Sequence, residues 1–354
     1  MSWLAAGIVL LIPTYLVRLT VFGLPTNLFE VLVVFGVLLQ ISTAAGQQQL
    51  RQAVRRVPPR FYWWTGALLL AVLISVAVSD VTRVSWGILK GWFVVPILAA
   101  GLVFTARGQK SGIEHTRLIA DALVVSGAGT ALLALFFFVP GERLAGIYDV
   151  PNSLALWLAP LAILAVGQGL QEIKEQREKS RARYYFIAAL VMFGALLLTQ
   201  SVAGILVTLG VGAAALFRHV DTSKQRRFLL RLTGVTVAVC LFLWGAGRIQ
   251  YFFQPNTSLA VRQQLWSVSL DLIHEQPLRG VGLGQFEPAY QAKLHERFQE
   301  YEAAPLREFV FRDPHNWILS FWLNTGLLGL VSFALLNYHA LRGRLWQPAG
   351  LALV

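Results

Sequence analysis

Long runs of apolar residues recur along the chain, and short polar segments separate them. Runs such as VLVVFGVLL, GALLLAVLISVAV and TGVTVAVCLFLWGAG extend with their neighbours to roughly 17–25 residues, the length at which a helix crosses ~30 Å of hydrocarbon. Backbone groups in lipid must pair within their own segment, so such runs predict helices. The pattern predicts an all-α, polytopic integral membrane protein with about ten transmembrane spans, at 2–17, 28–45, 61–78, 85–104, 118–139, 151–170, 184–200, 203–217, 232–247 and 315–337.

The turn between the seventh and eighth spans, near Gln200 and Ser201, has the weakest sequence pattern. The two spans can also be read as one long, broken hydrophobic segment. We keep the turn because, without it, the basic cluster at 218–231 would move to the opposite side of the membrane from the other basic loops.

Basic residues gather between the apolar runs and set an orientation. The chain has 30 Lys+Arg against 18 Asp+Glu, a formal net charge of +12. Alternate loops are rich in basic residues, whereas the short loops between them hold only Arg18, Arg83 and Arg143. This alternation follows the positive-inside rule, so it predicts a cytoplasmic N-terminus and argues against a nucleic-acid-binding protein. The basic loops are 46–60, 105–117, 171–183, 218–231 and the C-terminal end.

Composition supports the membrane class. Hydrophobic residues make up 56% of the chain and charged residues 14%, whereas soluble domains carry about 25% charged residues. Cys240 is the single cysteine and lies inside an apolar run, which excludes an intramolecular disulfide and a thiol metal site. The N-terminal MSWLAAGIVLLIP lacks the basic start and cleavage motif of a signal peptide, so it predicts a first span.

The pattern divides the chain into a nine-span bundle at 1–247, a long outer loop at 248–314, and the last span with a cytoplasmic end at 315–354. In the loop, SLAVRQQLWSVSLDLIHE has helical apolar spacing, Pro277 ends that helix, and RGVGLGQF forms a glycine-rich turn. We expect one or two helices lying at the outer membrane interface. The chain ends at QPAGLALV, which resembles the start of another apolar segment and leaves the completeness of the C-terminus open.

Three segments carry a recognisable motif. In DPHNWILSFWLNTGLLGL, His315-Asn316 is followed by nine residues, Gly326, two residues and Gly329. RLAGIYDVPNSLALWLAP has an arginine, a glycine and Pro151-Asn152 at the start of a span, and VRQQLWSVSLDLIHEQPLRGVGLGQF has the pattern Arg…Trp…Pro-x-x-Gly-x-Gly-x-Phe. These segments resemble, in family order, the bacterial O-antigen ligases and their polymerase relatives. IPTYLVRLTVFGLPTNLFE is similar to the first hairpin of that family.

The resemblance implies a glycosyltransferase of the bacterial inner membrane, without a cofactor. The donor would be an undecaprenyl-diphosphate-linked glycan. The acceptor would be a glycan, a lipid or a protein, and membrane lipids would surround the protein. A polysaccharide polymerase with the same machinery is the alternative. One departure concerns the turn after the seventh span, where many relatives have Thr-x-Ser-Arg-Gly and this chain has TQSVAG at 199–204, without the arginine.

The chemistry of such a transfer needs a base and cations. The diphosphate leaving group gains negative charge, which arginine stabilises with two donors at once, and histidine is the usual base for an acceptor hydroxyl. His315 is the candidate catalytic residue, and the candidate diphosphate ligands are Arg143, Arg262, Lys90, Arg279 and Arg312.

Each candidate also has a structural interpretation. His315 at a span end can be a hydrogen-bonded interfacial residue, the cations can be interface anchors, and Lys90 can snorkel to the surface. Gly326 and Gly329 are best interpreted as packing residues that let helices approach closely. The chain has no D-x-D sequence and no outward His/carboxylate cluster, which predicts a lipid-linked donor and a transfer without a metal.

A multi-pass transporter or lipid flippase is the rival from another class, and a non-catalytic scaffold is a further one. Transporters often have two similar halves with interrupted helices and ionisable groups near the midplane. The chain shows no obvious similarity between its halves, and its candidate cations gather towards the outer face. These features favour glycan transfer.

Overall fold

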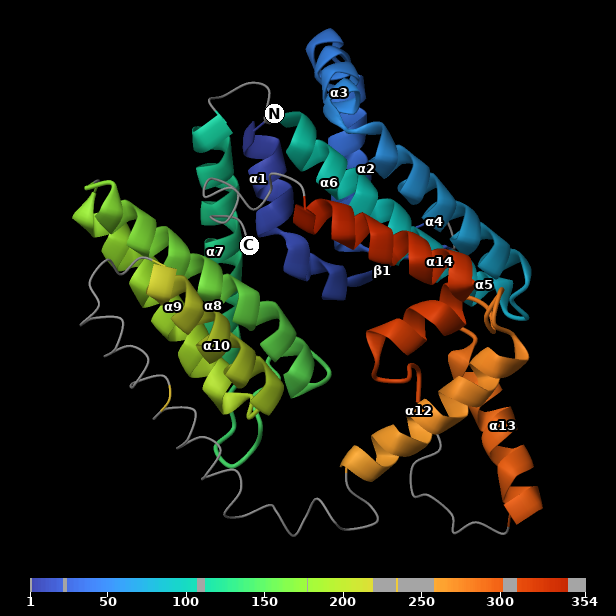
Figure 1. Ribbon diagram of the computed structural model, residues 1–354. Helices are drawn as coiled ribbons and strands as arrows, with labels where there is room; N and C mark the ends of the chain where they lie inside the picture. Colours follow the sequence, from blue (N-terminus) through green and yellow to red (C-terminus); the bar gives the residue numbers. More distant parts are fainter. Residues whose placement is uncertain are drawn as a thin grey trace. The chain divides into compact units, whose positions relative to one another are not determined.

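The computed structural model describes residues 2–21, 24–106, 112–176, 178–218, 234, 258–301 and 311–342. The chain divides into two compact units (Figure 1). The first comprises Met1–Ala53, Leu98–Phe242 and Trp346–Val354, and the second comprises Val54–Ile97 and Leu243–Leu345. The protein is mostly helical, as the apolar pattern predicts.

Six helices are long and apolar enough to cross a membrane in the part of the chain that the structure describes, or seven if a bent pair counts as one span. The spans predicted at 61–78, 85–104, 118–139, 151–170, 184–200 and 315–337 are confirmed as these helices. The count of ten is not reached among the described residues. The predicted span 232–247 lies outside them apart from Gly234. The six helices are Pro59–Ala77, Thr82–Ala106, Glu114–Phe136, Pro151–Lys174, Lys179–Leu198 and Trp317–Ala340.

The first predicted span, 2–17, does not form one continuous helix. Helix α1 (Ser2–Leu10) is followed by the 3₁₀-helix η1 (Ile12–Leu16), where Pro13 has no backbone N–H to extend the α-helix. Nine α-helical residues rise only about 14 Å. Strands β1 (Arg18–Val21) and β2 (Leu24–Asn27) then pair antiparallel, so the predicted all-α fold includes one short β-hairpin.

The second predicted span, 28–45, is also shorter than expected. Helix α2 (Leu28–Ile41) begins where Asn27 Oδ1 accepts a hydrogen bond from the backbone N–H of Glu30 at 2.9 Å. The segment 46–60, predicted as a loop, is mostly helix α3 (Ala44–Arg56), bent by 103° relative to α2. Alanine, glutamine, leucine and arginine favour helix, and Pro58 follows its end. The segment is thus helical, and its predicted position on the inner side between two spans stays a prediction.

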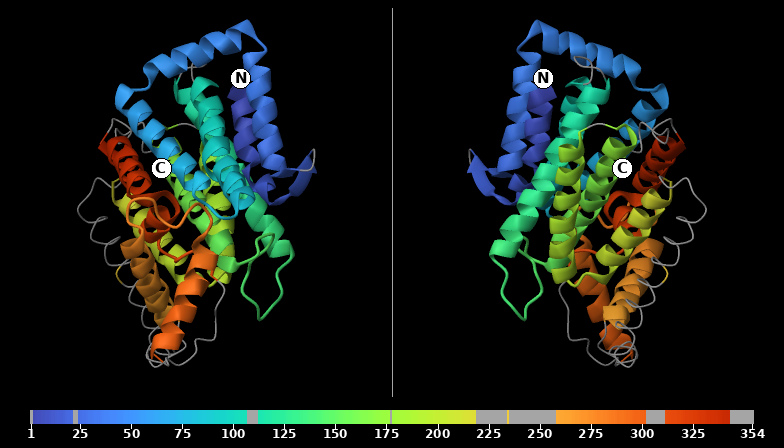
Figure 2. Two further views of the ribbon diagram at one scale, coloured as in Figure 1. Left: turned by 90° about the vertical axis from the view of Figure 1, so that its right-hand side faces the viewer. Right: turned by 90° about the vertical axis from the view of Figure 1, so that its left-hand side faces the viewer.

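The core of the first unit is formed by α7 (Gly112–Phe136), α8 (Pro151–Lys174) and α9 (Lys179–Leu198), which pack side by side (Figures 1 and 2). A Cβ atom on Gly127 of α7 would lie 2.7 Å from Met192 Sδ and 2.8 Å from Leu161 Cδ1, so glycine lets the three helices approach closely. Helix α10 (Val202–Arg218) packs on α8. The turn near Gln200 is confirmed, because α9 ends at Leu198 and Gln200 has a φ of +52°.

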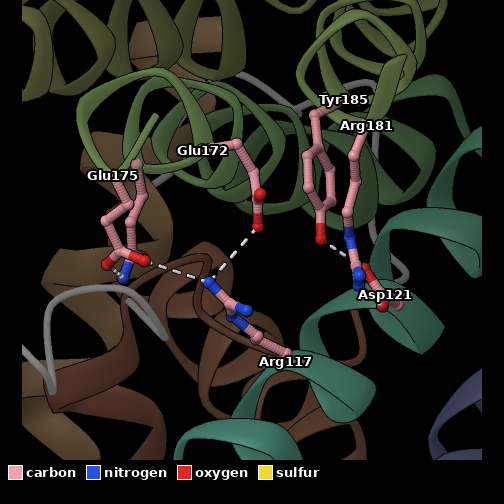
Figure 3. Close-up of polar contacts among 7 residues, drawn as sticks. Arg117, Asp121, Glu172, Glu175, Arg181 and Tyr185 are labelled. Carbon is pink, nitrogen blue, oxygen red and sulfur yellow. Dashed lines mark hydrogen bonds and ion pairs between the residues drawn. The ribbon is translucent and has the colours of Figure 1, made fainter. Parts of the chain in front are cut away.

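Ion pairs join the three helices at one end (Figure 3). Arg117 of α7 contacts Glu172 of α8 at 3.5 Å and Glu175, the residue after α8, at 3.1 Å. Arg181 and Tyr185 of α9 both donate to the Asp121 carboxylate on α7. The Glu172 side chain is only 4% exposed, and a carboxylate so deeply buried needs a paired cation. These contacts fix the register of the three helices.

The second unit contains α4 (Pro59–Ala77), α5 (Thr82–Ile88), the π-helix η2 (Leu89–Val94) and the start of α6 (Val95–Ala106), followed by three helices from the C-terminal part of the chain. Helices α12 (Ser258–Glu275) and α13 (Phe286–Tyr301) form in the segment where one or two helices were predicted. Helix α14 (Trp317–Arg342) packs along α4 (Figure 1). A Cβ atom on Gly329 of α14 would lie 3.5 Å from Ala71 Cβ of α4, which is ordinary packing contact, and 2.0 Å from Thr325 Oγ1 within α14.

Helix α14 is interrupted at Gly326, whose φ of 66° and ψ of −177° are not helical. The interruption docks onto the glycine-rich turn after α12. Val281 donates its backbone N–H to the Leu323 carbonyl at 2.8 Å, and Leu327 donates to the Leu278 carbonyl at 3.2 Å. The turn therefore satisfies backbone groups that the break releases, as a membrane protein requires.

Two glycines make this contact possible. A Cβ atom on Gly326 would lie 2.1 Å from the Leu278 carbonyl oxygen, and one on Gly280 would lie 2.2 Å from the Leu323 oxygen. Both residues have positive φ. Trp322 Nε1 donates to the Pro277 carbonyl at 2.7 Å, which adds a side-chain tie across the same junction. We call the contact between residues 277–281 and 322–327 the glycine junction.

We expect Gly326→Ala to destabilise the protein by about 2–4 kcal/mol, because it adds an atom against a backbone oxygen and strains a left-handed residue. Thermal unfolding of the purified protein in detergent would measure the effect. Gly66→Ala is the matched control, since nothing lies within 4 Å of its added Cβ. Equal melting temperatures for the two variants would contradict the role given to the glycine junction.

Candidate functional site

The candidate site lies in the segment just before α14. Asn316 caps the helix, because its Oδ1 accepts hydrogen bonds from the backbone N–H groups of Ile318 at 3.0 Å and Leu319 at 3.3 Å. Asparagine in the His-Asn motif therefore has a structural reason. It fixes the direction in which α14 begins and so the position of His315.

His315 is held by Asp313 at two points. The Asp313 Oδ1 atom accepts the backbone N–H of His315 at 2.8 Å and lies 3.3 Å from Nδ1 of the ring. With the proton on Nδ1 directed at this carboxylate, the lone pair of Nε2 is left for an outside proton donor. The His315 side chain is 52% exposed, so such a donor can reach it.

The backbone of His315 is strained, with a φ of +50°. Left-handed backbone is uncommon for residues other than glycine, and asparagine, aspartate and histidine are the side chains most often found there. Strain of this kind gathers at functional sites, where the surrounding structure maintains it. The strain turns the chain sharply between Asp313 and the Asn316 cap.

An aromatic series supports the ring of His315. Phe311 lies edge-on to His315 with centroids 6.0 Å apart, and Tyr290 of α13 lies edge-on to Phe311 at 6.0 Å. Gln264 Nε2 of α12 donates to the Tyr290 hydroxyl at 2.8 Å. Burial raises the pKa of Tyr290 above its usual value, so its hydroxyl stays neutral near neutral pH. Helix α12 therefore holds Tyr290 of α13, and Tyr290 in turn packs on the ring that contacts His315.

Trp266 connects α12 to residues 311–316, which we call the histidine segment. Its Nε1 donates to the carbonyl of Pro314, the residue before His315, at 3.1 Å. Arg262 lies four residues earlier on α12, and side chains at that spacing start roughly 5–6 Å apart on one helix face. This spacing puts Arg262 on the same face of α12 as Trp266.

The other predicted diphosphate ligands of the second unit, Arg312, Arg279 and Lys90, lie in different elements. Arg312 lies in the same short segment as His315 and is exposed. Arg279 is exposed at the glycine junction, and Lys90 is half-buried in η2. Within the described ranges, the structure gives the side chains of Arg262, Arg279 and Arg312 no ion pair. In contrast, Arg297 of α13 is paired with Asp271.

Arg143 belongs to the first unit and joins two other family motifs. Its Nε donates to the Thr199 carbonyl at 3.0 Å, and its Nη2 donates to Asn152 Oδ1 at 3.2 Å. Pro151 begins α8, where its missing N–H costs nothing. A basic group therefore lies at the 199–204 turn, although the arginine of the related sequences is absent there. Arg143 and His315 belong to different units, so their joint action on one diphosphate stays a prediction.

Sequence reasoning missed the residues that position His315. Asp313 had a local signal, since it lies two residues before the histidine in DPHN. Trp266, Tyr290 and Phe311 come from three separate segments, and no spacing rule joins them. In the described part of the chain, no group of three or more His, Cys, Asp or Glu residues is arranged to hold a metal. The predicted metal independence of the transfer stays a prediction.

A comparison with protein families matches residues 187–334 to the O-antigen ligase family. Residues 187–334 resemble an O-antigen ligase domain. The resemblance seen in the motifs is therefore confirmed, and the domain includes His315, Asn316, Gly326 and Gly329. Arg262, Arg279 and Arg312 also lie in the O-antigen ligase domain, whereas Lys90, Arg143, Pro151 and Asn152 precede it. A comparison with curated proteins found no match.

Trp266→Phe should loosen the histidine segment of the O-antigen ligase domain while keeping its ring packing. The loss of one hydrogen bond costs about 1 kcal/mol, so the fold should survive. We expect faster hydrogen exchange at residues 311–316 with little change elsewhere. Trp63→Phe is the control, since Trp63 of α4 is 77% exposed. Unchanged exchange at 311–316 would show that Trp266 does not hold the segment.

Proposed function

We propose that this protein is a membrane glycosyltransferase of the O-antigen ligase type. It would transfer a glycan from an undecaprenyl-diphosphate donor to an acceptor on the outer face of the bacterial inner membrane. The observation that carries the proposal is the Asp313–His315 pair at the head of α14, inside the O-antigen ligase domain. A base held by a carboxylate and exposed on its free side suits the activation of a hydroxyl.

In the proposed reaction, the acceptor hydroxyl gives its proton to Nε2 of His315. Its oxygen forms a bond to the anomeric carbon of the donor sugar. The bond between that carbon and the diphosphate oxygen breaks, and the diphosphate leaves with the electron pair. Asp313 stabilises the imidazolium that forms, through its contact with Nδ1. The reaction is thus a single displacement with one proton transfer, and it is balanced without a cofactor.

The leaving diphosphate gains charge, and we assign its stabilisation to arginine. Arg312 lies three residues before His315, and Arg262 shares the face of α12 that carries Trp266. Arg279 and Lys90 would serve as further contacts. Arg143 would contribute from the first unit, with the donors that Thr199 and Asn152 do not use. A transfer without a metal follows from this assignment, since the arginines take the role of the cation.

The orientation in this proposal comes from the basic loops. A cytoplasmic N-terminus puts the loops 171–183 and 218–231 in the cytoplasm and the segment 248–314 outside. His315 would then meet the donor at the outer surface, where the exposed half of its ring is open to an acceptor. Ligation and polymerisation share every step above and differ in the acceptor alone. An assay with lipid-linked glycan as the only acceptor therefore distinguishes a polymerase from a ligase.

His315→Asn should lower transfer by about 10²–10⁴-fold, the range typical of losing a general base. Asparagine tolerates left-handed backbone, so the variant removes the titratable ring without adding strain. Turnover of a lipid-linked donor by purified protein measures the effect, and donor binding should change little. His274→Asn, an exposed histidine at the end of α12, is the control. Normal turnover with an unchanged pH profile in His315→Asn would remove His315 from the chemistry.

Arg262→Lys keeps the charge but loses the planar fork that binds two phosphate oxygens. We expect about a 10–100-fold fall in turnover with normal amounts of folded protein in the membrane. Arg83→Lys, an exposed arginine on α5, should retain full activity. If Arg262→Lys matches Arg83→Lys, then Arg262 is an anchor and not a diphosphate ligand.

A further inference from the structure

An open groove of about 530 Å³ runs between α7 and α9 in the first unit. Ala128 and Leu132 of α7 line it from one side, and Ile187 and Val191 of α9 line it from the other. Both helices are long and apolar enough to cross a membrane. The groove therefore lies between two helices that can each cross the membrane.

The groove has an apolar body and one polar end. Ser180, Arg183 and Tyr184 line it near the start of α9. From Ser180 to Val191 the helix rises about 16 Å, and one leaflet of a ~30 Å hydrocarbon layer is about 15 Å thick. The polar end and the apolar body thus match the headgroup and hydrocarbon depths of a single leaflet. Tyrosine at the boundary fits the same depth, since tyrosine gathers at membrane interfaces.

The cation at the polar end is available for a ligand. Its neighbour Arg181 is engaged by Asp121, together with Tyr185 (Figure 3). Arg183 is exposed, and the structure gives it no ion pair or hydrogen bond with any described residue. It stands in the basic stretch 174–183, which contains two lysines and two more arginines. Basic pockets between transmembrane helices bind anionic lipid headgroups.

We propose that the groove binds one acyl chain of an anionic phospholipid, whose phosphate pairs with Arg183. The apolar side chains of the groove would contact the acyl chain, and the Arg183 guanidinium would bind two oxygens of the phosphate. An anionic headgroup is favoured over a zwitterionic one because the surrounding basic stretch attracts net negative charge. The bound lipid fills the space between α7 and α9 and stabilises their packing. The groove belongs to the first unit and His315 to the second, and this proposal does not depend on the proposed reaction.

The test uses the purified full chain in detergent, with phosphatidylglycerol and phosphatidylcholine as probes. Native mass spectrometry measures how much of each lipid is retained. The wild type should retain phosphatidylglycerol preferentially. Arg183→Gln should weaken that retention about fivefold, towards the level of phosphatidylcholine. Arg55→Gln, which changes an exposed arginine of α3, should leave it unchanged.

A second pair of variants tests the apolar wall. Ile187 and Leu190 are both exposed residues of α9, at 62% and 71%, but only Ile187 lines the groove. Ile187→Trp should reduce retention of both lipids several-fold, and Leu190→Trp should not. Melting temperatures without added lipid should be equal in all variants, which excludes misfolding as the cause. Equal retention of the two lipids by the wild type, unchanged retention in Arg183→Gln, or equal effects of the two tryptophans would each overturn the proposal. Displacement of phosphatidylglycerol by a polyprenyl phosphate would also overturn it, in favour of a donor site.

Discussion

The glycine junction is the contact on which the arrangement of the second unit depends. A helix that breaks inside a membrane protein exposes backbone groups that lipid cannot satisfy. The break at Gly326 solves this problem because the turn after α12 supplies both a donor to Leu323 and an acceptor for Leu327. Each side needs glycine, since any side chain at Gly280 or Gly326 would meet the opposite carbonyl. The requirement is reciprocal, so neither segment can adopt its conformation alone.

The position of the histidine segment depends on the glycine junction. The part of α14 before the break carries the Asn316 cap at its start, and α12 contacts the same segment through Trp266. The Trp266 bond connects α12 to the segment before α14, and the glycine junction connects the turn after α12 to the break in α14. His315 therefore lies on a support fixed from two directions, while its own ring remains half-exposed. This combination of a held backbone and an open face suits the base proposed for His315.

The sequence predicted elements whose signals are local and strong. Apolar runs of 17–25 residues became helices, Pro277 ended α12, and the charge pattern correctly required a turn near Gln200. The continuous span expected at 2–17 is broken because hydropathy does not register the effect of Pro13. The helix within 46–60 was not foreseen because a polar, basic stretch can still be a good helix. The surroundings of His315 were beyond prediction, since the Trp266 indole joins residues 48 positions apart and the rings of Tyr290 and Phe311 join two further segments.

Polar contacts join the three core helices of the first unit, α7, α8 and α9, at both ends. At one end Asp121 joins α7 to α9, and Arg117 joins α7 to α8. At the other end Arg143, in the loop after α7, bonds to the residue after α9 and to the first turn of α8. Slippage of one helix along another would break polar contacts at both ends simultaneously. The three helices therefore form one rigid body. During turnover they can tilt or shift together, but they cannot slide along one another.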